Sequence, residues 1–369
     1  MTTTAPTATG ASSSGGHRPL LEVDNLRTHF RTPRGLVKAV DGVSLTLERG
    51  RTLGLVGESG SGKSVLSRSI MQLFPKRNVA TSGTVRFDGR DLTAMTPKEL
   101  QSFWGREVAM VFQDPMTSLN PVMKIGKQLT EGLRKHLGLD RDQADARALD
   151  LLRNVHIPEP EQRLGEYRHQ LSGGMRQRVT IAMALACNPK LLFADEATTA
   201  LDVTVQAQIL NLLQDLQEER EMAMVLVTHD LGVVAGRTHD IAVMYAGRIV
   251  EKAPTPTLFA NMKMPYTEAL LRSIPKLENP SHTPLQVIGG RPPDLIDPPP
   301  GCKFSPRCPY AQERCHHEEP PLLPAGEPGH SFACWYPVGT VENGEALARN
   351  LAQGLAQARV VVESRPAEA

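Results

Sequence analysis

Short apolar runs recur along the chain and alternate with longer segments of helical character. Residues 19–56 alternate in the manner of strands, as in "LLEVDNLRTHF", "VKAVDGVSLTL" and "TLGLV". Later runs are "EVAMVF" (107–112), "KLLFADE" (190–196) and "AMVLVTHD" (223–230), each bounded by charged or turn residues. Runs of this length and composition are typical of strands covered on both faces. The pattern predicts an α/β protein.

Two further segments add to this pattern. Residues 127–155 carry Leu and Ala at mostly helical spacing and predict a helical subdomain that interrupts the strands. Residues 241–253, "IAVMYAGRIVEKA", predict a hairpin that turns at Ala246 and Gly247.

Composition divides the chain into parts. The first residues, "MTTTAPTATGASSSGGH", are small and polar, and after about residue 275 proline becomes dense and excludes helix and central strand. Leucines at 347, 351 and 355 indicate a weak helix near the end. The predicted parts are a disordered tail (1–18), a core domain (19–265, with its helical subdomain at about 114–175), a proline- and cysteine-rich extension (266–337) and a polar tail (338–369).

Composition and charge describe an ordinary soluble protein. The 369 residues are 40% hydrophobic and 22% charged, and the formal net charge is +1. This balance gives no electrostatic reason to expect nucleic acid as a partner. The sequence has neither a secretory signal nor an apolar run long enough to span a membrane. We therefore expect a cytosolic chain that reaches the membrane through partners.

A phosphate-binding loop follows the third predicted strand. Residues 57–64, "GESGSGKS", match the G-x-x-x-x-G-K-[ST] pattern between a strand and a helical segment. Backbone N–H groups of such a loop, with the positive end of the next helix, bind phosphate oxygens. Lys63 would reach the β- and γ-phosphates, and Ser64 would bind Mg²⁺. The members of this predicted ATP loop are Gly57, Glu58, Ser59, Gly60, Ser61, Gly62, Lys63 and Ser64.

Two carboxylates end a later buried strand. In "LLFADE", Asp195 lies at the carboxyl end of the strand and Glu196 follows it. We expect Asp195 to bind Mg²⁺ and Glu196 to polarise the attacking water as the general base. An apolar strand that ends in Asp-Glu is common by itself. Here Asp195 follows Lys63 by 132 residues, and this placement supports a metal site.

Three more motifs indicate a resemblance to a known family. "VFQDP" (111–115), "LSGGMRQR" (171–178) and "VLVTHD" (225–230) follow the loop in the order of the ATP-binding cassette ATPases, which residues 20–260 resemble. The resemblance implies a cassette with a mainly parallel sheet core, an antiparallel β subdomain, a helical subdomain and, in this chain, a cysteine-rich C-terminal extension.

The resemblance also implies roles for individual residues. The segment "LSGGMRQR" (171–178) is the signature loop of this family. It would cap the γ-phosphate bound to an opposite subunit, so that ATP joins two cassettes. Gln113 would contact Mg²⁺ and the water, His229 the γ-phosphate, and Phe30 the adenine ring. The further ATP-binding residues implied are Ser172, Gly173, Gly174 and Asp202.

A narrower resemblance covers residues 19–337. "FQDPMTSLNP", "ALDVTVQAQIL", "PYTEALLRSIP" and "PPPGCKFSPRCPYAQERC" resemble the ATP-binding subunits of oligopeptide and dipeptide importers. It implies an ATPase on the cytoplasmic face of the membrane, bound to two permease subunits and indirectly to an extracytoplasmic solute-binding protein. The second ATPase would be a homologous chain or another copy of this one.

Four of the five cysteines lie within 33 residues, as Cys302, Cys308, Cys315 and Cys334. The subfamily resemblance associates them with an iron–sulfur cluster, and four thiolates would suit [4Fe–4S]. Zinc, with help from histidines 316, 317 or 330, and unliganded thiols remain alternatives. We expect a structural role and a site energetically separate from the ATP loop, since the tail supplies no predicted phosphate contact. Cys187 is expected to be a buried apolar residue.

Two other functions remain open at this point. Close relatives of peptide importers serve other cargo, such as nickel or glutathione, and the ATPase subunit does not hold the cargo site. A soluble cassette ATPase that acts on ribosomes or DNA is the other alternative, but such proteins usually carry two cassettes or long coiled coils, and this chain has neither.

Overall fold

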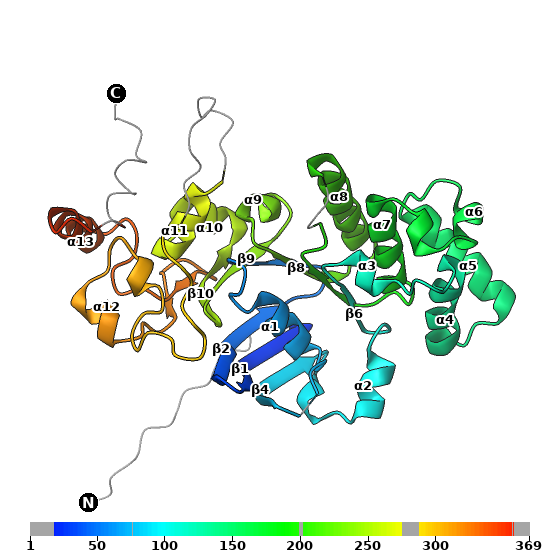
Figure 1. Cartoon of the computed structure of the whole chain (residues 1–369), viewed down its shortest axis with the longest axis horizontal. Helices are drawn as coiled ribbons and strands as arrows, with labels where there is room; N and C mark the ends of the chain where they lie inside the picture. The colour runs from blue at the N-terminus through cyan, green and yellow to red at the C-terminus, as the bar shows by residue number, and fades with distance from the viewer. Residues whose placement is uncertain (1–17, 76, 199–201, 275–287, 356, 358–369) are drawn as a thin grey trace, which may run out of the picture.

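Two sheets, with helices around them, make up the computed structural model, which describes residues 18–75, 77–198, 202–274, 288–355 and 357 (Figure 1). Of the two predicted polar tails, residues 1–17 and 358–369 lie outside the described residues.

The smaller sheet is antiparallel and forms from the alternating stretches near the start of the chain. Its strand order is β2-β1-β4-β5. Every second residue at the start of β1 is buried, so one face of the sheet joins the core, as the alternation predicts. The strands are β1 (Leu21–Thr32), β2 (Gly35–Leu47), β4 (Val79–Phe87) and β5 (Arg90–Asp91).

The larger sheet has the order β11-β12-β10-β9-β3-β8-β7-β6. Strands β6, β7, β8, β3 and β9 pair in parallel, and β10 turns back on β9 as the predicted hairpin. All residues of β3, β6, β7 and β8 are buried, which confirms strands covered on both faces. The strands are β3 (Thr52–Val56), β6 (Val108–Val111), β7 (Leu191–Asp195), β8 (Ala223–Thr228), β9 (Asp240–Tyr245), β10 (Arg248–Pro254), β11 (Leu323–Pro324) and β12 (Ser331–Phe332).

Helices cover the large sheet, and several of them form the group at the right of Figure 1. They are α1 (Lys63–Ile70), α2 (Pro97–Phe103), α3 (Pro115–Ser118), α4 (Ile125–Leu137), α5 (Arg141–Asn154), α6 (Pro160–Leu164), α7 (Gly173–Ala184), α8 (Val203–Glu219), α9 (Leu231–Val234), α10 (Thr255–Asn261), α11 (Pro265–Arg272), α12 (Glu313–His317) and α13 (Val341–Ala352), with short 3₁₀ turns η1 (Leu92–Ala94), η2 (Arg168–Gln170) and η3 (Ser305–Arg307). Within the described ranges, no helix is long and apolar enough to cross a membrane.

The helical segment predicted over 127–155 forms as two helices, α4 and α5. Gly138 ends α4 in the left-handed region, with φ 68°. Asp140 then begins α5 in a capping box with Gln143. A glycine cap followed by an acidic cap therefore breaks the apolar periodicity.

The C-terminal arm, residues 288–337, packs directly on the large sheet. Its strand β12 pairs with β10, and β11 pairs with β12, so the arm extends the sheet by two short strands. Phe304 is buried against Tyr245 and Tyr266, with ring centroids 5.3 and 5.4 Å away. The arm therefore shares the main apolar core.

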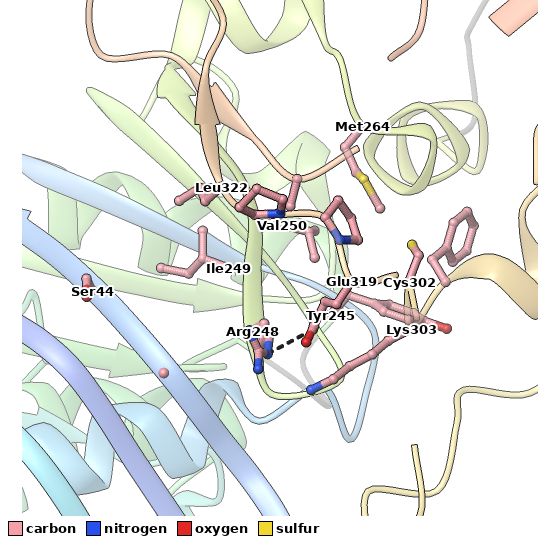
Figure 2. Close-up of a pocket in the computed structure, with 15 residues that line it drawn as sticks. Ser44, Tyr245, Arg248, Ile249, Val250, Met264, Cys302, Lys303, Glu319 and Leu322 are labelled. Atoms are coloured by element: carbon pink, nitrogen blue, oxygen red, sulfur yellow. Dashed lines mark ion pairs between the residues drawn. The ribbon is translucent and has the colours of Figure 1, made fainter. Parts of the chain in front are cut away.

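A pocket of about 330 Å³ lies between the arm and the β9–β10 hairpin (Figure 2). Arg248 Nε lies 3.0 Å from a carboxylate oxygen of Glu319 across this junction. The Nζ of Lys303 donates to the carbonyl oxygen of Ala246, at 3.0 Å, and lies 3.5 Å from Asp41. Polar contacts thus tie the arm to the hairpin turn.

The weak helix predicted near the end forms as α13. Leu347 is buried with Ala346 and Tyr310, and the Nδ2 of Asn350 donates to the carbonyl oxygens of Pro309 and Ala311. The helix is held by the arm rather than by its own propensity.

A buried carboxylate joins the arm to β10. Glu251 is fully buried and accepts hydrogen bonds from the backbone N–H groups of Lys263 and Met264, at 2.5 and 3.2 Å. The Nε2 of His330, also buried, lies 2.9 Å from Glu251 Oε1. Removal of the imidazole would leave a buried oxygen without this partner.

We predict that His330→Ala destabilises the fold by about 1–3 kcal/mol, because a buried carboxylate loses one of its hydrogen-bond partners. Chemical denaturation of the full chain measures it. His317→Ala is the matched control. His317 is exposed, and its ring contacts Glu313 of its own helix, at 2.8 Å. Equal stability of the two variants would show that the buried contact does not hold the arm.

Candidate active site

Three parallel strands bring distant residues to one edge of the large sheet. Strands β3 and β7 both pair in parallel with β8, so their carboxyl ends lie together. The loop 57–64 follows β3, the pair Asp195–Glu196 ends β7, and His229 follows β8. Crevices beyond the carboxyl ends of parallel strands are the usual ligand sites of such sheets.

The loop 57–64 curls around the first turn of α1. Gly62, with φ 105°, is the N-cap of this helix and provides no side-chain cap, so the helix N-terminus is open to an anion. A Cβ at Gly62 would lie 2.2 Å from the carbonyl oxygen of Ala39, and one at Gly57 would lie 2.1 Å from that of Met244. The fold therefore requires glycine at both positions.

Lys63 lies inside the loop. Its buried ammonium donates to the carbonyl oxygens of Gly57 and Glu58, at 2.7 and 2.9 Å, and lies 3.9 Å from Glu196 Oε1. Burial lowers the pKa of Lys63, although Glu196 and Asp195 oppose that shift. A cation enclosed in this way is placed to meet phosphate.

Asp195 fits a metal ligand. It is fully buried, its Oδ1 accepts a hydrogen bond from Ser64 Oγ at 2.7 Å, and its Oδ2 accepts none among the described residues. Burial raises the pKa of this carboxyl, since the Ser64 hydroxyl and Arg68 compensate only in part. A buried carboxylate oxygen that accepts no hydrogen bond from the described residues, beside a hydroxyl, suits Mg²⁺, which prefers oxygen ligands.

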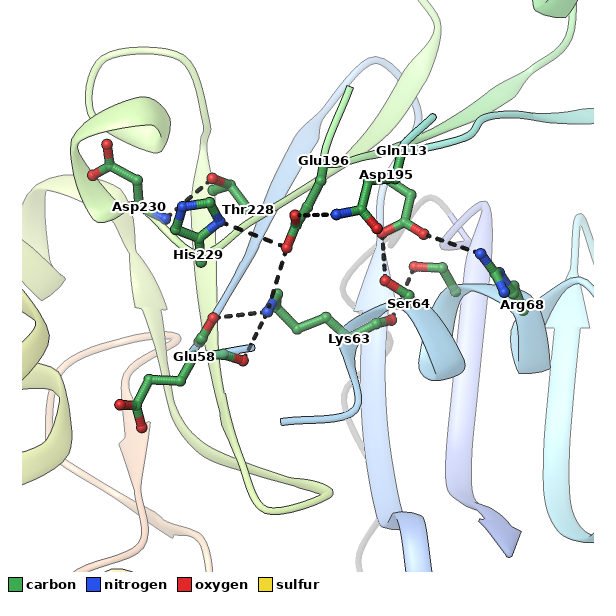
Figure 3. Close-up of polar contacts among 12 residues, drawn as sticks. Glu58, Lys63, Ser64, Arg68, Gln113, Asp195, Glu196, Thr228, His229 and Asp230 are labelled. Carbon is green, nitrogen blue, oxygen red and sulfur yellow. Dashed lines mark hydrogen bonds and ion pairs between the residues drawn. The ribbon is translucent and has the colours of Figure 1, made fainter. Parts of the chain in front are cut away.

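Glu196 is the centre of the polar network in Figure 3. Its Oε2 accepts a hydrogen bond from Gln113 Nε2 at 2.8 Å, and its Oε1 lies 3.6 Å from His229 Nδ1. The backbone of Glu196 has φ 46°, a conformation that is uncommon for residues other than glycine and often occurs at functional sites. The structure thus brings Lys63, Gln113, Glu196 and His229 together.

The other predicted nucleotide residues lie elsewhere. Phe30 contacts Phe74 edge to face, with ring centroids 5.2 Å apart. Ser172 is the N-cap of α7, and Ser172 and Gly173 are exposed; α7 lies among α4–α6, apart from α1 (Figure 1). Asp202 is exposed and caps α8, accepting a hydrogen bond from Val205 N at 2.9 Å. These positions leave the signature loop open to a second molecule.

The four clustered cysteines line one small pocket. Burial raises the pKa of Cys302 to about 11 and also raises the pKa values of the other three thiols. Cys187 is buried, as predicted. Within the described parts of the chain, no group of three or more His, Cys, Asp or Glu side chains is arranged to hold a metal ion, and His330 contacts Glu251 instead. This geometry therefore supports neither zinc nor an iron–sulfur cluster.

One contact that was not predicted from the sequence joins the arm to the loop 57–64; the energetic separation of the two sites stays a prediction. Arg307, which lies between Cys302 and Cys308, pairs with Glu58 of the loop through two hydrogen bonds, at 2.6 and 2.9 Å. Tyr266 of α11 also accepts a hydrogen bond from the backbone N–H of Glu58, at 2.8 Å. In the sequence, the hint of this contact was that Glu58 is the one acidic residue of the loop 57–64.

Two known protein families match this chain. Residues 40–199 match the ABC transporter family. This range includes the loop 57–64 and the pair Asp195–Glu196. Residues 250–315 match the family described as "Oligopeptide/dipeptide transporter, C-terminal region", which includes three of the four clustered cysteines.

Among individual proteins, the chain is similar to peptide transport subunits along most of its length. It is 50% identical over 317 residues to the oligopeptide transport ATP-binding protein OppD of Bacillus subtilis, which is 86% of this chain and 88% of that protein. It is 48% identical over 319 residues to the dipeptide transport ATP-binding protein DppD of Escherichia coli, covering 86% of this chain and 97% of that protein.

Solved structures agree on the cassette fold. A dimeric structure of the ATP-binding cassette MJ0796 with ADP and phosphate has a TM-score of 0.58 and 28% identity, over 64% of this chain and 98% of that one. Another is cbiO1 of Clostridium perfringens, part of the transporter complex cbiONQ, with a TM-score of 0.57 and 26% identity over 66% of this chain and 92% of that one.

The buried carboxyl of Asp195 generates a prediction about stability. Because its pKa is raised in the fold, the folded chain holds this proton more tightly than the unfolded chain, and stability falls as pH rises through the ordinary aspartate range toward the raised value. Asp195→Asn imitates the protonated group. We expect a higher thermal midpoint than wild type at neutral pH without nucleotide, and a smaller gain when Mg²⁺ and ATP are added. A lower midpoint without nucleotide would contradict the argument.

The control is Asp294→Asn. This exposed carboxylate contacts Arg34 at 3.2 Å, so its replacement removes the same charge at a surface site. Neither the midpoint nor the gain with nucleotide should change.

Proposed function

The chain belongs to the family of ATP-binding subunits of oligopeptide and dipeptide ABC transporters, and from this membership we propose how its residues perform the reaction and what it binds. It is an ATPase whose hydrolysis of ATP energises peptide uptake. The observation that carries the mechanism is the meeting of Lys63, Asp195 and Glu196 at one sheet edge.

We propose that the loop 57–64 binds the phosphates of ATP. Backbone N–H groups at the open N-terminus of α1 and the ammonium of Lys63 supply positive charge there. Ser64 and Asp195 would hold Mg²⁺, and Gln113, which donates to Glu196, is assigned to the metal and the water. The ion would supply positive charge against the charge that develops on the phosphates.

Glu196 acts as the general base. It accepts the proton of the attacking water, while the amide of Gln113, at 2.8 Å, fixes the orientation of its carboxylate. His229 lies on the other side of the carboxylate, with its side chain 58% exposed, and is free to turn toward a γ-phosphate. Phe30 is assigned to the adenine ring.

A second cassette completes the site. The exposed residues Ser172 and Gly173 and the half-buried Gly174 at the N-terminus of α7 bind the γ-phosphate held by the partner, and Asp202 lies at the same interface. The similar cassette MJ0796 is dimeric, which supports this arrangement. We propose that the partner ATPase is a homologous chain, with a second copy of this chain as the alternative.

The assembly includes the membrane. The family implies membrane permease partners, and we propose two of them, with this chain bound at their cytoplasmic face and an extracytoplasmic solute-binding protein delivering the peptide. The Gln113 loop and α3 are exposed, and α3 lies beside α7 of the helical group, where a permease can contact both (Figure 1).

We further propose that the four clustered cysteines hold a [4Fe–4S] cluster as thiolates. Their convergence on one pocket, from positions spread over 33 residues, supports this assignment. Burial favours the neutral thiols, so binding of the cluster would release protons and depend on pH. The cluster would tie the segments of the arm together.

The role of Glu196 is tested by Glu196→Gln, which keeps the size of the side chain and removes its basicity. ATP binding by the full chain should persist, while turnover by the assembled transporter falls by about 100-fold or more. Lys63→Ala, in contrast, should weaken ATP binding itself. Hydrolysis near the wild-type rate in Glu196→Gln would assign the base to another group.

The cluster is tested by elemental analysis of protein purified without oxygen. We expect about four irons and four sulfides per chain. Cys308→Ser should deplete both, whereas Cys187→Ser, which changes a buried cysteine outside the pocket, should not. Stoichiometric zinc, or four titratable thiols and no metal, would overturn the assignment.

A further inference from the structure

Arg307 of the arm reaches into the phosphate loop. It ends the short turn η3 between Cys302 and Cys308. Its Nη1 donates to Glu58 Oε2 at 2.6 Å, and its Nη2 donates to Glu58 Oε1 at 2.9 Å. Two parallel hydrogen bonds from one guanidinium to one carboxylate form the strongest and most directional kind of ion pair. The pair joins residues that are 249 positions apart.

The guanidinium is fixed from its own side. It is only 3% exposed, and it also donates to the carbonyl oxygens of Gly289 and Ile288, at 2.8 and 3.1 Å, and to the hydroxyl of Tyr245 at 3.3 Å. Burial alone would lower the pKa of Arg307, but its hydrogen bonds to Glu58 and Tyr245 raise it. A buried cation held this firmly requires the carboxylate as its counter-charge.

Glu58 is held at each of its polar groups. Arg307 binds the carboxylate, the hydroxyl of Tyr266 accepts from the backbone N–H, and Lys63 Nζ donates to the carbonyl oxygen. Two of these three partners come from the part of the chain after residue 260. The path of the loop at its second residue is therefore set from outside the loop.

The charge of Glu58 matters because the loop receives phosphates. Its side chain is 25% exposed, so without Arg307 the carboxylate would be free to turn toward Lys63 Nζ, which already contacts the same residue. There it would repel phosphate oxygens and compete with them for the ammonium, at distances where the Coulomb interaction is several-fold stronger than in water.

We propose that Arg307 is a positioning residue for ATP binding. It neutralises Glu58 and holds that carboxylate away from the phosphate site, so the cysteine-rich arm sets the ATP affinity of the cassette. This inference rests on the proposed role of residues 57–64 as the ATP loop. A purely structural role for the pair would instead fix the arm on the sheet and leave the loop unaffected.

The test is the affinity of the full chain for a fluorescent ATP analogue with Mg²⁺. Arg307→Gln should weaken binding by about tenfold or more, within the range of coupling measured for close charge pairs. Arg307→Lys retains the charge but not the two-point contact, so its affinity should be intermediate. This variant also keeps the proposal testable if Arg307→Gln misfolds. In Glu58→Gln/Arg307→Gln the affinity should recover to within about threefold of wild type, because the unpaired carboxylate is gone.

The rescue separates the two roles of the pair. If Arg307 only fixed the arm, the double variant would bind ATP no better than Arg307→Gln, since the contacts of Arg307 to Gly289 and Ile288 are lost in both. That result, or unchanged affinity in both Arg307→Gln and Arg307→Lys, would overturn the proposal.

Two controls complete the design. Arg34→Gln breaks another ion pair to the arm, Arg34–Asp294 at 3.2 Å, whose side chains are 79% and 54% exposed; ATP affinity should remain within about twofold of wild type. Lys63→Ala tests the loop itself. If wild type and Lys63→Ala bind the analogue equally, the proposed function of the loop fails; if Lys63→Ala alone loses binding, only the inference about Arg307 fails.

Discussion

Parallel pairing of β8 with β3 on one side and β7 on the other is the constraint on which the whole site depends. Strands that run in the same direction end at the same edge, so three loops from distant parts of the chain must meet there. The meeting brings an ammonium, two carboxylates and an imidazole within hydrogen-bonding or ion-pairing reach. Such a concentration of charge is stable because each group has a partner of opposite sign or a hydrogen-bond donor.

The same edge is closed from outside by the end of the chain. Strand β12 extends the large sheet through β10, and Phe304 completes an aromatic cluster with Tyr245 and Tyr266. From this apolar base two cations extend toward the loops, Lys303 to the β9–β10 turn and Arg307 to Glu58. Gly247 lies in that β9–β10 turn, and its backbone N–H donates to the carbonyl oxygen of Ser61 in the phosphate loop, at 2.9 Å. Core packing of the arm and the shape of the loop are therefore linked.

The sequence was informative where the signal is local. Buried strands, the β9–β10 hairpin and the loop 57–64 each carry their pattern within a dozen residues, and each forms where it was expected. The helical spacing over 127–155 did not by itself show where α4 ends at Gly138 and α5 begins. Local patterns failed for the arm, because a proline-rich composition does not reveal which surface it will cover. Nothing near Arg307 distinguishes it from an ordinary basic residue, since its partner is 249 positions away.

The contacts of η3 connect the cysteine pocket with the loop 57–64. Within seven residues, Cys302 and Cys308 line the pocket while Arg307 binds Glu58. The turn is tied to the sulfur site by its own backbone: Cys302 N donates to the carbonyl oxygen of Cys315 at 2.8 Å, and Ser305 N donates to that of Cys302 at 2.9 Å. Two-point pairing of a guanidinium tolerates little displacement. A displacement of η3 would therefore weaken the contact that holds Glu58.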